Sequence, residues 1–345
     1  MKIEEFDYHL PEELIAQEPC EVRDQARMMV VHKRTGLIEN KDFPDLPEFL
    51  EKGDVLIIND TKVIPARLIG KKASGGQIEI LLLRRRDDTP SGQIWEVLLR
   101  PAKRVQVGGQ IWFNEGCRAM IIDRISDKKW LLAFITDLPF DQFLHQYGKA
   151  PLPPYIKRRG DYTTDREDIK RYQTVYARVP GSVAAPTAGL HFSQNLLNTL
   201  KDQGIQFAPV TLHCGYGTFL PIETELVEDH LMEEEFLEIG EEASEMVNGA
   251  ERLIAVGTTS TRVIESASDE QGRIRPTAGF TRLFIYPGYH FKRVNALITN
   301  FHLPRSSLFL LVCAFAGKNL MQEAYQRAIA DRYRFYSYGD CMLIL

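Results

Sequence analysis

The stretch Val55-Leu56-Ile57-Ile58-Asn59-Asp60-Thr61-Lys62-Val63-Ile64-Pro65 decides the fold. Its first part, Val55–Asn59, is a short apolar run of the kind that forms a strand buried on both faces of a sheet. Its second part, Thr61–Pro65, is typical of a linker, because it ends at a proline and the composition changes after it. The chain therefore passes from one domain into another near residue 62.

Short β segments with Gly-rich or charged turns between them follow this linker. They lie at Ala66–Lys71, Gln77–Leu83, Ile94–Leu99, Gln110–Phe113, Cys117–Ile125 and Trp130–Ile135. About six short strands in succession predict a small antiparallel barrel or sandwich. A second, proline-rich linker at Pro151–Tyr155 ends the segment. We therefore expect an inserted β-barrel domain over residues 63–151.

The rest of the chain alternates short apolar runs with helical patterns. Further buried strands are expected at Phe207–His213, Leu253–Val256 and Ala296–Thr299. Helices are expected at Pro11–Gln17, Ser193–Gln203, Glu241–Gly249, Ser260–Ser268 and Leu320–Asp331. This alternation is typical of an α/β sheet. The predicted fold class is a mixed α/β main domain, residues 1–62 and 152–345, interrupted by the small antiparallel β-barrel.

The composition of the 345 residues, 44% hydrophobic and 26% charged, is ordinary for a globular protein. No apolar run approaches the roughly 20 residues that span a bilayer, so we expect no membrane association. The five scattered cysteines lack a C-x-x-C and the histidines lack metal spacing, which favours a cytoplasmic protein without disulfides or a metal. We also expect the protein to be a monomer. The net charge of −5 argues against a protein that coats nucleic acid, but it allows a local basic patch.

The run Gly181-Ser182-Val183-Ala184-Ala185-Pro186-Thr187-Ala188-Gly189-Leu190-His191-Phe192 consists mostly of small residues, Pro and Gly. Such residues let a backbone approach a ligand closely. Ser193 then fits a helix N-cap, and a helix N-terminus favours anions. We expect Ser182, Thr187 and Gly189 to contact a ligand. A tightly packed connection without a ligand explains the same pattern equally well.

Polar residues follow three of the predicted strands. They lie at His213–Phe219, Gly257–Arg262 and Thr299–Pro304. Because ligands of open α/β sheets bind beyond the carboxyl ends of the strands, these tips and the small-residue run predict one pocket. Ordinary caps and turns are the alternative for each tip taken alone.

The familiar nucleotide-binding and nucleophile motifs do not occur. Gly215-Tyr216-Gly217 lacks the later glycine of G-x-G-x-x-G, and neither a P-loop nor a G-x-S-x-G elbow is present. Cys214 directly follows His213, and an imidazole beside a thiol is typical of a thiolate nucleophile. Adjacent residues of a strand, however, point to opposite faces. We therefore expect Cys214 to be a packed thiol.

Basic residues cluster in and beside the predicted barrel and near the C-terminus. The clusters are Arg84–Arg86, Arg100–Arg104, Lys157–Arg159, and Arg332 and Arg334 among Tyr333, Phe335, Tyr336 and Tyr338. Cations interleaved with rings suit phosphate contact and base stacking. For Arg84–Arg86, a charged strand edge that resists aggregation is the alternative.

Long segments resemble the S-adenosylmethionine:tRNA ribosyltransferase-isomerase family of queuosine biosynthesis. The matching segments are Phe6–Asp24, Asn59–Gly70, Tyr172–Tyr176, Gly181–Phe192, Thr211–Phe219, Ala255–Arg262, Phe284–Tyr289, Leu297–Leu311 and Tyr333–Leu345. The chain departs from the family pattern at a few positions. Glu233 stands where a histidine commonly follows His230, which leaves open whether Glu233 takes over a histidine role.

The resemblance implies a reaction with tRNA. The ribosyl part of S-adenosylmethionine is transferred to 7-aminomethyl-7-deazaguanine at the wobble position of the anticodon and rearranged, which gives epoxyqueuosine, adenine and methionine. S-Adenosylmethionine is then consumed as a substrate, with no metal and no bound cofactor. The resemblance also implies a larger α/β domain interrupted by a small β-barrel.

The implied chemistry directs attention to particular side chains. Histidines titrate near neutral pH, so His191, His213 and His302 are candidates for proton transfer. Thr258, Thr259 and Arg262, at a helix start, are expected to bind the methionine carboxylate. Further substrate contacts are expected from Tyr216, Thr218, Phe219 and Asn300, and tRNA contacts from Arg104, Lys157, Arg158, Arg159 and Arg334.

Two other function classes stay open on the residues alone. One is an RNA-binding module without catalysis, and the other is a methyltransferase that uses the same donor. Adenine release requires ribosyl transfer, whereas S-adenosylhomocysteine would require methylation.

Overall fold

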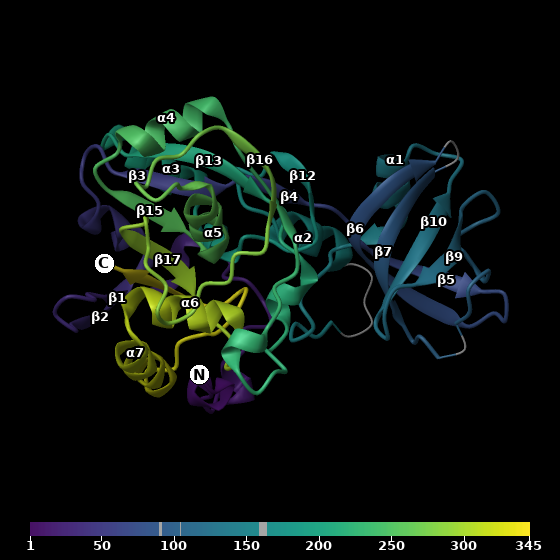
Figure 1. Cartoon of the computed structure of the whole chain (residues 1–345), viewed down its shortest axis with the longest axis horizontal. Helices are drawn as coiled ribbons and strands as arrows, with labels where there is room; N and C mark the ends of the chain where they lie inside the picture. The colour runs from purple at the N-terminus through teal and green to yellow at the C-terminus, as the bar shows by residue number, and fades with distance from the viewer. Residues whose placement is uncertain (90–91, 104, 159–163) are drawn as a thin grey trace. The chain divides into compact units, whose positions relative to one another are not determined.

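The computed structural model describes residues 1–89, 92–103, 105–158 and 164–345. The chain divides into two compact units (Figure 1). The main unit consists of Met1–Lys62, Pro153–Arg159 and Gln173–Leu345, and the barrel unit of Val63–Leu152 and Gly160–Tyr172. Residues 164–172 thus belong to the same unit as the strands that precede them in the chain.

The main unit is built on a mixed sheet, which has nine strands over the described residues. Its strands, in spatial order, are β16 (Thr277–Thr281), β14 (Glu235–Ile239), β13 (Gln206–Leu212), β3 (Val55–Asn59), β15 (Leu253–Val256), β17 (Ala296–Asn300), β18 (Cys341–Ile344), β1 (Arg27–Val31) and β2 (Ile38–Asp42). The central strands β13, β3, β15 and β17 are parallel. The edges are antiparallel, except that β18 and β1 pair in parallel.

Both faces of this sheet are covered, so alternate residues of β3 serve two cores. Val55 and Ile57 pack in one core and Leu56 and Ile58 in the other. The first core includes residues of α4 (Glu241–Gly249), α5 (Thr258–Ala267), α6 (Ser307–Ala316) and α7 (Lys318–Ala330). The second includes residues of α3 (Gln194–Asp202) and of the 3₁₀ helix Phe43–Phe49. This double burial explains the continuous apolar run.

The barrel unit is a closed antiparallel barrel, with six strands in the part of the chain that the structure describes. Its strands are β5 (Arg67–Lys72), β6 (Gln77–Thr89), β7 (Gly92–Arg100), β10 (Lys129–Ile135), β9 (Arg118–Arg124) and β8 (Gln110–Trp112). The barrel closes where β8 pairs with β5, with Lys71 opposite Trp112. Short β11 (Gly148–Lys149) adds to β5, and the unit also holds α1 (Phe140–Tyr147) and α2 (Thr164–Arg171). The predicted fold class is confirmed.

Several predicted elements differ in the structure. The helix expected at Pro11–Gln17 is a single 3₁₀ turn, Glu12–Leu14. Helix α6 was not predicted, because it is buried on nearly every side and shows no amphipathic period. The rings of Tyr333, Phe335 and Tyr338 are buried and lie outside the pocket lining, so the expectation that they stack on bases is wrong. The ring of Tyr336 is also buried, but it lines the pocket described below.

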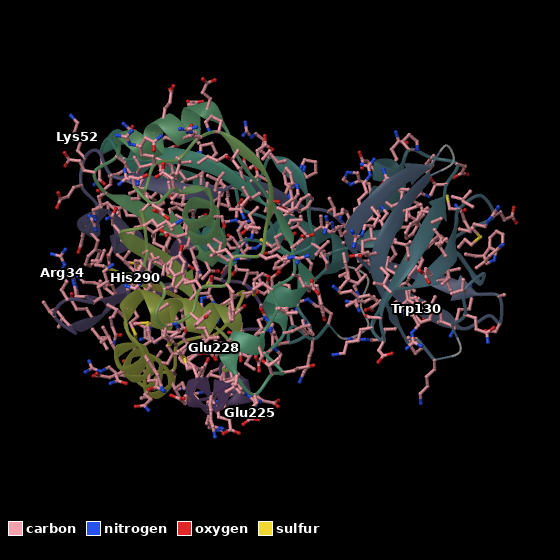
Figure 2. The ribbon with its side chains drawn as sticks, viewed as in Figure 1. Arg34, Lys52, Trp130, Glu225, Glu228 and His290 are labelled. Atoms are coloured by element: carbon pink, nitrogen blue, oxygen red, sulfur yellow. The ribbon has the colours of Figure 1, made fainter. Side chains whose placement is uncertain are left out.

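The N-terminal residues are tied to the acidic segment that leads to β14. The Met1 ammonium pairs with Glu228 at 2.9 Å, and the Ile3 amide donates to the Glu225 carbonyl at 3.0 Å. Glu225 and Glu228 are labelled beside the N-terminal ribbon in Figure 2. Two strands outside the large sheet, β4 (Thr61–Val63) and β12 (Val179–Ser182), pair with each other.

Candidate active site

A pocket that is partly open to solvent lies at the carboxyl ends of β15 and β17. The small-residue run and the three strand tips all contribute to it. Of the predicted site residues, its lining includes Thr187, Thr218, Phe219, Thr258, Thr259, Asn300 and His302. The structure therefore brings together segments that are more than 100 residues apart in the chain.

Helix α5 opens into this pocket without a side-chain cap. Its N-cap is Gly257, which has a φ of +94° and carries no side chain that can accept from the first-turn amides. Thr258 and Thr259 in that first turn line the pocket. Among the described residues, the buried Thr259 Oγ1 has no hydrogen-bond partner. The amides, the helix dipole and this hydroxyl together form a place for an anion.

Asn300 is the last residue of β17, and its neutral amide side chain lines the same pocket. Its Nδ2 lies 3.1 Å from His191 Nε2 and donates to the carbonyls of Tyr336 and Asp340. Its Oδ1 is buried and has no partner among the described residues. His191 itself lies behind this wall, with its ring 5.3 Å from that of Phe43, and it is not a lining residue.

His302 is the candidate histidine that lines the pocket. Its Nε2 lies 2.8 Å from Thr299 Oγ1. Burial lowers the pKa of His302 to about 3 and that of His191 to about 4, so both imidazoles are neutral at neutral pH. The same burial makes each ring a weak base, and His302 is the one of the two that lines the pocket.

His213 lies outside the pocket lining. Its Nδ1 lies 2.8 Å from Thr61 Oγ1, and its ring stacks on Phe236. Its Nε2 lies so close to Gly181 that a Cβ there would be only 2.5 Å away. Burial lowers the pKa of His213, and the nearby Asp60 carboxylate partly opposes this shift. The glycine of the small-residue run therefore makes room for an imidazole.

Ser182 and Gly189 are occupied by contacts within the protein. The Ser182 hydroxyl donates to the Ala184 carbonyl at 2.7 Å and accepts from the Cys214 amide at 2.9 Å. A Cβ on Gly189 would be 2.1 Å from the Tyr176 hydroxyl. Here the tightly packed connection is the better description, whereas Ala185–Ala188 of the same run face the pocket.

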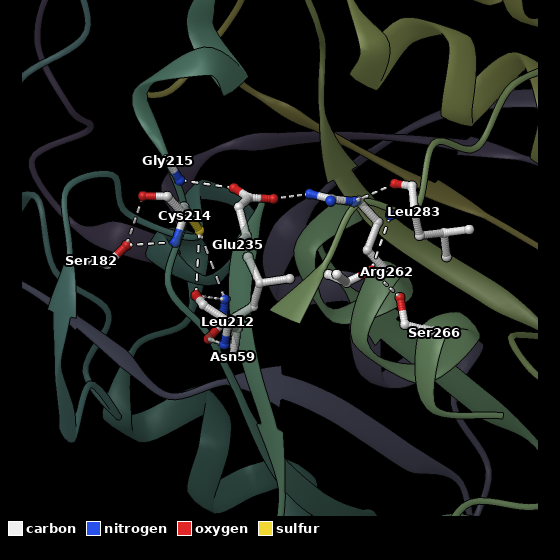
Figure 3. Close-up of polar contacts among 10 residues, drawn as sticks. Asn59, Ser182, Leu212, Cys214, Gly215, Glu235, Arg262, Ser266 and Leu283 are labelled. Carbon is white, nitrogen blue, oxygen red and sulfur yellow. Dashed lines mark hydrogen bonds and ion pairs between the residues drawn. The ribbon is translucent and has the colours of Figure 1, made fainter. Parts of the chain in front are cut away.

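Arg262 is also held by the protein rather than placed in the pocket lining. Its Nη1 donates to Glu235 Oε2 and its Nε to the Leu283 carbonyl at 3.0 Å (Figure 3). Glu235 Oε1 accepts from the Gly215 amide at 2.8 Å, so this buried pair connects α5 and β14 to the loop that carries Thr218 and Phe219. Glu233 lies beside this loop, with its carboxyl carbon 3.5 Å from where a Cβ on Gly217 would stand.

Cys214 is buried, and burial raises the pKa of its thiol. It is therefore protonated and not a nucleophile at neutral pH. Tyr216 packs edge-on against Phe219, with the ring centroids 6.0 Å apart. Pocket residues that the sequence did not place there include Tyr155, whose hydroxyl lies 2.6 Å from Ser337 Oγ. No sequence pattern in the proline-rich linker or in the C-terminal segment indicated that the two segments line the same pocket.

The candidate tRNA contacts differ in how far they are exposed. The Lys157 side chain is 76% exposed, with Glu12 3.9 Å away. Arg158 pairs with Glu18 at 3.1 Å and donates to the Gln17 carbonyl, while Arg334 donates to the Glu18 carbonyl. Arg104 and Arg159 lie outside the described residues.

Two findings concern sites of other kinds. No group of three or more His, Cys, Asp or Glu side chains in the described ranges is placed to hold a metal ion. Within those same ranges, no helix has the length and apolar character that crossing a membrane requires.

Comparison with known proteins places these features in context. A family model described as queuosine biosynthesis protein matches residues 3–344. Proteins named S-adenosylmethionine:tRNA ribosyltransferase-isomerase from Syntrophus aciditrophicus and Acetivibrio thermocellus are 60% and 49% identical, over the full length of both chains in each comparison. A crystal structure of S-adenosylmethionine tRNA ribosyltransferase from Thermotoga maritima matches with a TM-score of 0.55 and 38% identity, covering 99% of this chain and 100% of that chain.

Proposed function

The chain belongs to the queuosine biosynthesis family of S-adenosylmethionine:tRNA ribosyltransferase-isomerases, and from this premise we propose its substrates, products and site. The ribosyl group of S-adenosylmethionine passes to the aminomethyl nitrogen of 7-aminomethyl-7-deazaguanine at the tRNA wobble position and rearranges to the epoxycyclopentane of epoxyqueuosine. Adenine and methionine are released, so S-adenosylmethionine is consumed as a substrate rather than retained as a cofactor.

The observation that carries this proposal is the uncapped N-terminus of α5 inside the pocket. Thr258 and Thr259 present first-turn amides there, and Thr259 Oγ1 is buried without a protein partner. These groups suit the methionine carboxylate of the donor. Arg262, which the sequence favoured for this role, supports α5 through Glu235 instead.

The aromatic part of the pocket suits the rest of the donor. Phe219 and Tyr155 line it, with Tyr216 packed behind Phe219. Aromatic faces stack on adenine and attract a sulfonium cation. This part of the pocket therefore receives the adenosyl and sulfonium groups.

Proton transfer is assigned to His302, because it is the candidate histidine that lines the pocket. It serves as the base that removes the proton next to the sulfonium, with Thr299 holding its Nε2 side. A positioned acid or base contributes roughly 10²–10⁴-fold to a rate. His191 and His213 lie outside the pocket lining, where they contact Asn300 and Thr61.

We place the enzyme in the cytoplasm as a monomer, with Lys157 as a contact to tRNA phosphate. The free cysteines, most of them buried, support a reducing compartment. The exposure of Lys157 supports the phosphate contact.

Product analysis tests the proposal directly. The protein is incubated with S-adenosylmethionine and a tRNA that carries 7-aminomethyl-7-deazaguanine, with guanine-containing tRNA as the control. Adenine and methionine must appear in equal amounts with the modified tRNA. Release of S-adenosylhomocysteine, or no turnover despite binding, would overturn it.

A further inference from the structure

Two central strands of the main sheet each end in a buried asparagine, and the two side chains differ in how many of their polar atoms have hydrogen-bond partners. Asn59 ends β3, and its Oδ1 accepts from the amides of Thr61 and Leu212, both at 3.1 Å. Its Nδ2 donates to the Leu212 carbonyl at 3.0 Å (Figure 3). Asn300 ends β17, and its nitrogen is equally well held, but its oxygen has no partner among the described residues.

An unsatisfied amide oxygen at a site this deeply buried costs free energy unless a ligand supplies a donor. Asn300 is 2% exposed and lines the pocket. The carbonyls of Tyr336 and Asp340 fix the orientation of its amide, because both require Nδ2 as the donor. The oxygen is therefore the atom of Asn300 that a ligand can use, and the ligand must donate.

The strand register places this acceptor next to the anion site of α5. Val256 of β15 is opposite Ile298 of β17, and the Gly257 amide donates to the Ile298 carbonyl at 2.8 Å. Val256 and Ile298 lie on adjacent strands about 4.8 Å apart. Thr258, the first residue of α5, and Asn300, the last residue of β17, each follow two residues later. The ligand groups that they bind must therefore also be close together.

An α-amino acid carries its carboxylate and its ammonium on the same carbon, which matches a helix N-terminus beside a neutral acceptor. The described lining residues include no Asp, Glu, Lys or Arg, so the pocket suits a group without net charge. We propose that Asn300 Oδ1 accepts a hydrogen bond from the α-ammonium of the donor's methionine end, whose carboxylate lies at the N-terminus of α5. This inference rests on the proposed function and assigns a specificity residue within it.

His191 holds Asn300 for this task. The two hydrogens of Nδ2 serve its two 3.1 Å contacts, with the Tyr336 carbonyl and with His191 Nε2, and the Asp340 carbonyl at 3.4 Å shares one of them, so His191 Nε2 is the acceptor. The proton of the neutral ring is then on Nδ1. Burial, which lowers the pKa of His191 to about 4, preserves this state at neutral pH. His191 is a positioning residue and not a proton donor to substrate.

A chemical double-mutant cycle tests the assignment. Calorimetry measures the affinities of the parent protein and of Asn300→Leu for S-adenosylmethionine, for its analogue without the α-amino group, and for its decarboxylated analogue. On the parent, loss of the amino group weakens binding roughly 10- to 100-fold, as expected for a hydrogen bond to a charged group. On Asn300→Leu, this discrimination disappears, while discrimination against the decarboxylated analogue remains.

Three outcomes overturn the inference. Discrimination against the deaminated analogue that persists undiminished in Asn300→Leu excludes the contact. A loss of discrimination confined to an analogue without the 6-amino group of adenine reassigns Asn300 to the base. A parent protein that binds both methionine-end analogues as well as S-adenosylmethionine places the methionine end elsewhere. A parent protein that does not bind S-adenosylmethionine instead refutes the proposed function.

Asn59→Leu is the matched control, because it removes a buried strand-terminal asparagine that the protein itself satisfies. It lowers the melting temperature but leaves discrimination against both analogues intact.

The role of His191 is tested by rescue. His191→Phe reduces discrimination against the deaminated analogue, and His191→Gln, whose amide oxygen can accept, restores it. Equal discrimination in parent and His191→Phe excludes the positioning role.

Discussion

The Arg262 guanidinium donates to the Glu235 carboxylate in the interior of the main unit, and both side chains are about 95% buried. The same carboxylate accepts from the Gly215 amide at 2.8 Å. The pair therefore joins the first turns of α5 to the loop that carries Thr218 and Phe219. A break in this pair changes the support of two pocket walls at once.

We predict that Arg262→Met lowers the free energy of unfolding by about 3–5 kcal/mol, because it leaves the buried Glu235 carboxylate without its partner. The double variant Arg262→Met/Glu235→Leu recovers most of that loss. Urea unfolding of the parent, both single variants and the double variant gives the four values. A single variant as stable as the parent would show that the pair is not an energetic unit.

Donor binding by the same variant separates support from direct contact. If Arg262 only supports α5, Arg262→Met weakens binding of S-adenosylmethionine and of its decarboxylated analogue by the same factor. Equal factors by calorimetry confirm this. If the variant no longer distinguishes the two ligands, Arg262 contacts the carboxylate, as the sequence alone suggested.

The buried histidines predict loss of stability in acid. Burial holds the pKa of His302 at about 3 and that of His191 at about 4, well below the value of about 6.5 in the unfolded chain. Between these limits the unfolded state binds more protons, so stability rises with pH and falls as the pH drops below about 6.5. Each histidine contributes a slope of up to about 1.4 kcal/mol per pH unit.

Urea unfolding at pH 7.5, 6.0 and 5.0 measures this slope. The free energy of unfolding of His302→Gln declines less steeply over this range than that of the parent, although the variant is less stable at pH 7.5. Parallel curves for the two proteins would show that His302 takes up a proton as readily in the native state as in the unfolded chain.

The catalytic assignment of His302 predicts both a rate and a pH profile. His302→Ala lowers kcat for adenine release by roughly 10²–10⁴-fold with a smaller effect on KM, because the base acts in the chemical step. Since the pKa of His302 is about 3, the base form is present throughout the physiological range. The parent kcat therefore shows no acid limb near pH 6.5. A variant rate within a factor of a few of the parent excludes this role.

The sequence predicts the fold well wherever an element is buried in a regular way. Val55–Asn59, Leu253–Val256 and Glu241–Gly249 have the predicted bounds, since each pattern depends on burial of whole faces. Strands at one antiparallel edge were missed, because β14 alternates between a core and solvent over only five positions and β16 has a single buried residue, Thr281. Helix α6 was missed because it is apolar all round.

The site was predictable to the level of segments but not of side-chain direction. The position of Thr259 and Asn300 beyond apolar strands was enough to place them at the pocket. Periodicity says nothing about which side of a loop residue faces a ligand, so His191 and Gly189 seemed equivalent to Thr187. The partner of Arg262 is 27 residues away on an antiparallel strand, and no local pattern reports that contact.

The cap of α3 predicts a local contribution to stability. Ser193 Oγ accepts from the Leu196 amide at 3.1 Å and donates to Asp24. Ser193→Ala is expected to lower the free energy of unfolding by about 1 kcal/mol, while Ser193→Asn loses less because its side chain also caps. Urea denaturation of both variants measures the difference. A stability unchanged in Ser193→Ala would contradict the capping role.

Two described cations follow the second linker, Lys157 and Arg158, and we expect them to affect tRNA binding differently. Lys157 is exposed and its contact with Glu12 is a weak surface pair, so it is available to a phosphate. Lys157→Ala therefore reduces the slope of log affinity against log salt by about one. Arg158 is occupied by Glu18 and by the Gln17 carbonyl, so Arg158→Ala lowers thermal stability instead and leaves the slope nearly unchanged. Lys52→Ala is the control, because Lys52 precedes β3 and so lies at the edge of the sheet opposite the pocket. A slope that Lys157→Ala and Lys52→Ala change equally would remove Lys157 from the tRNA interface.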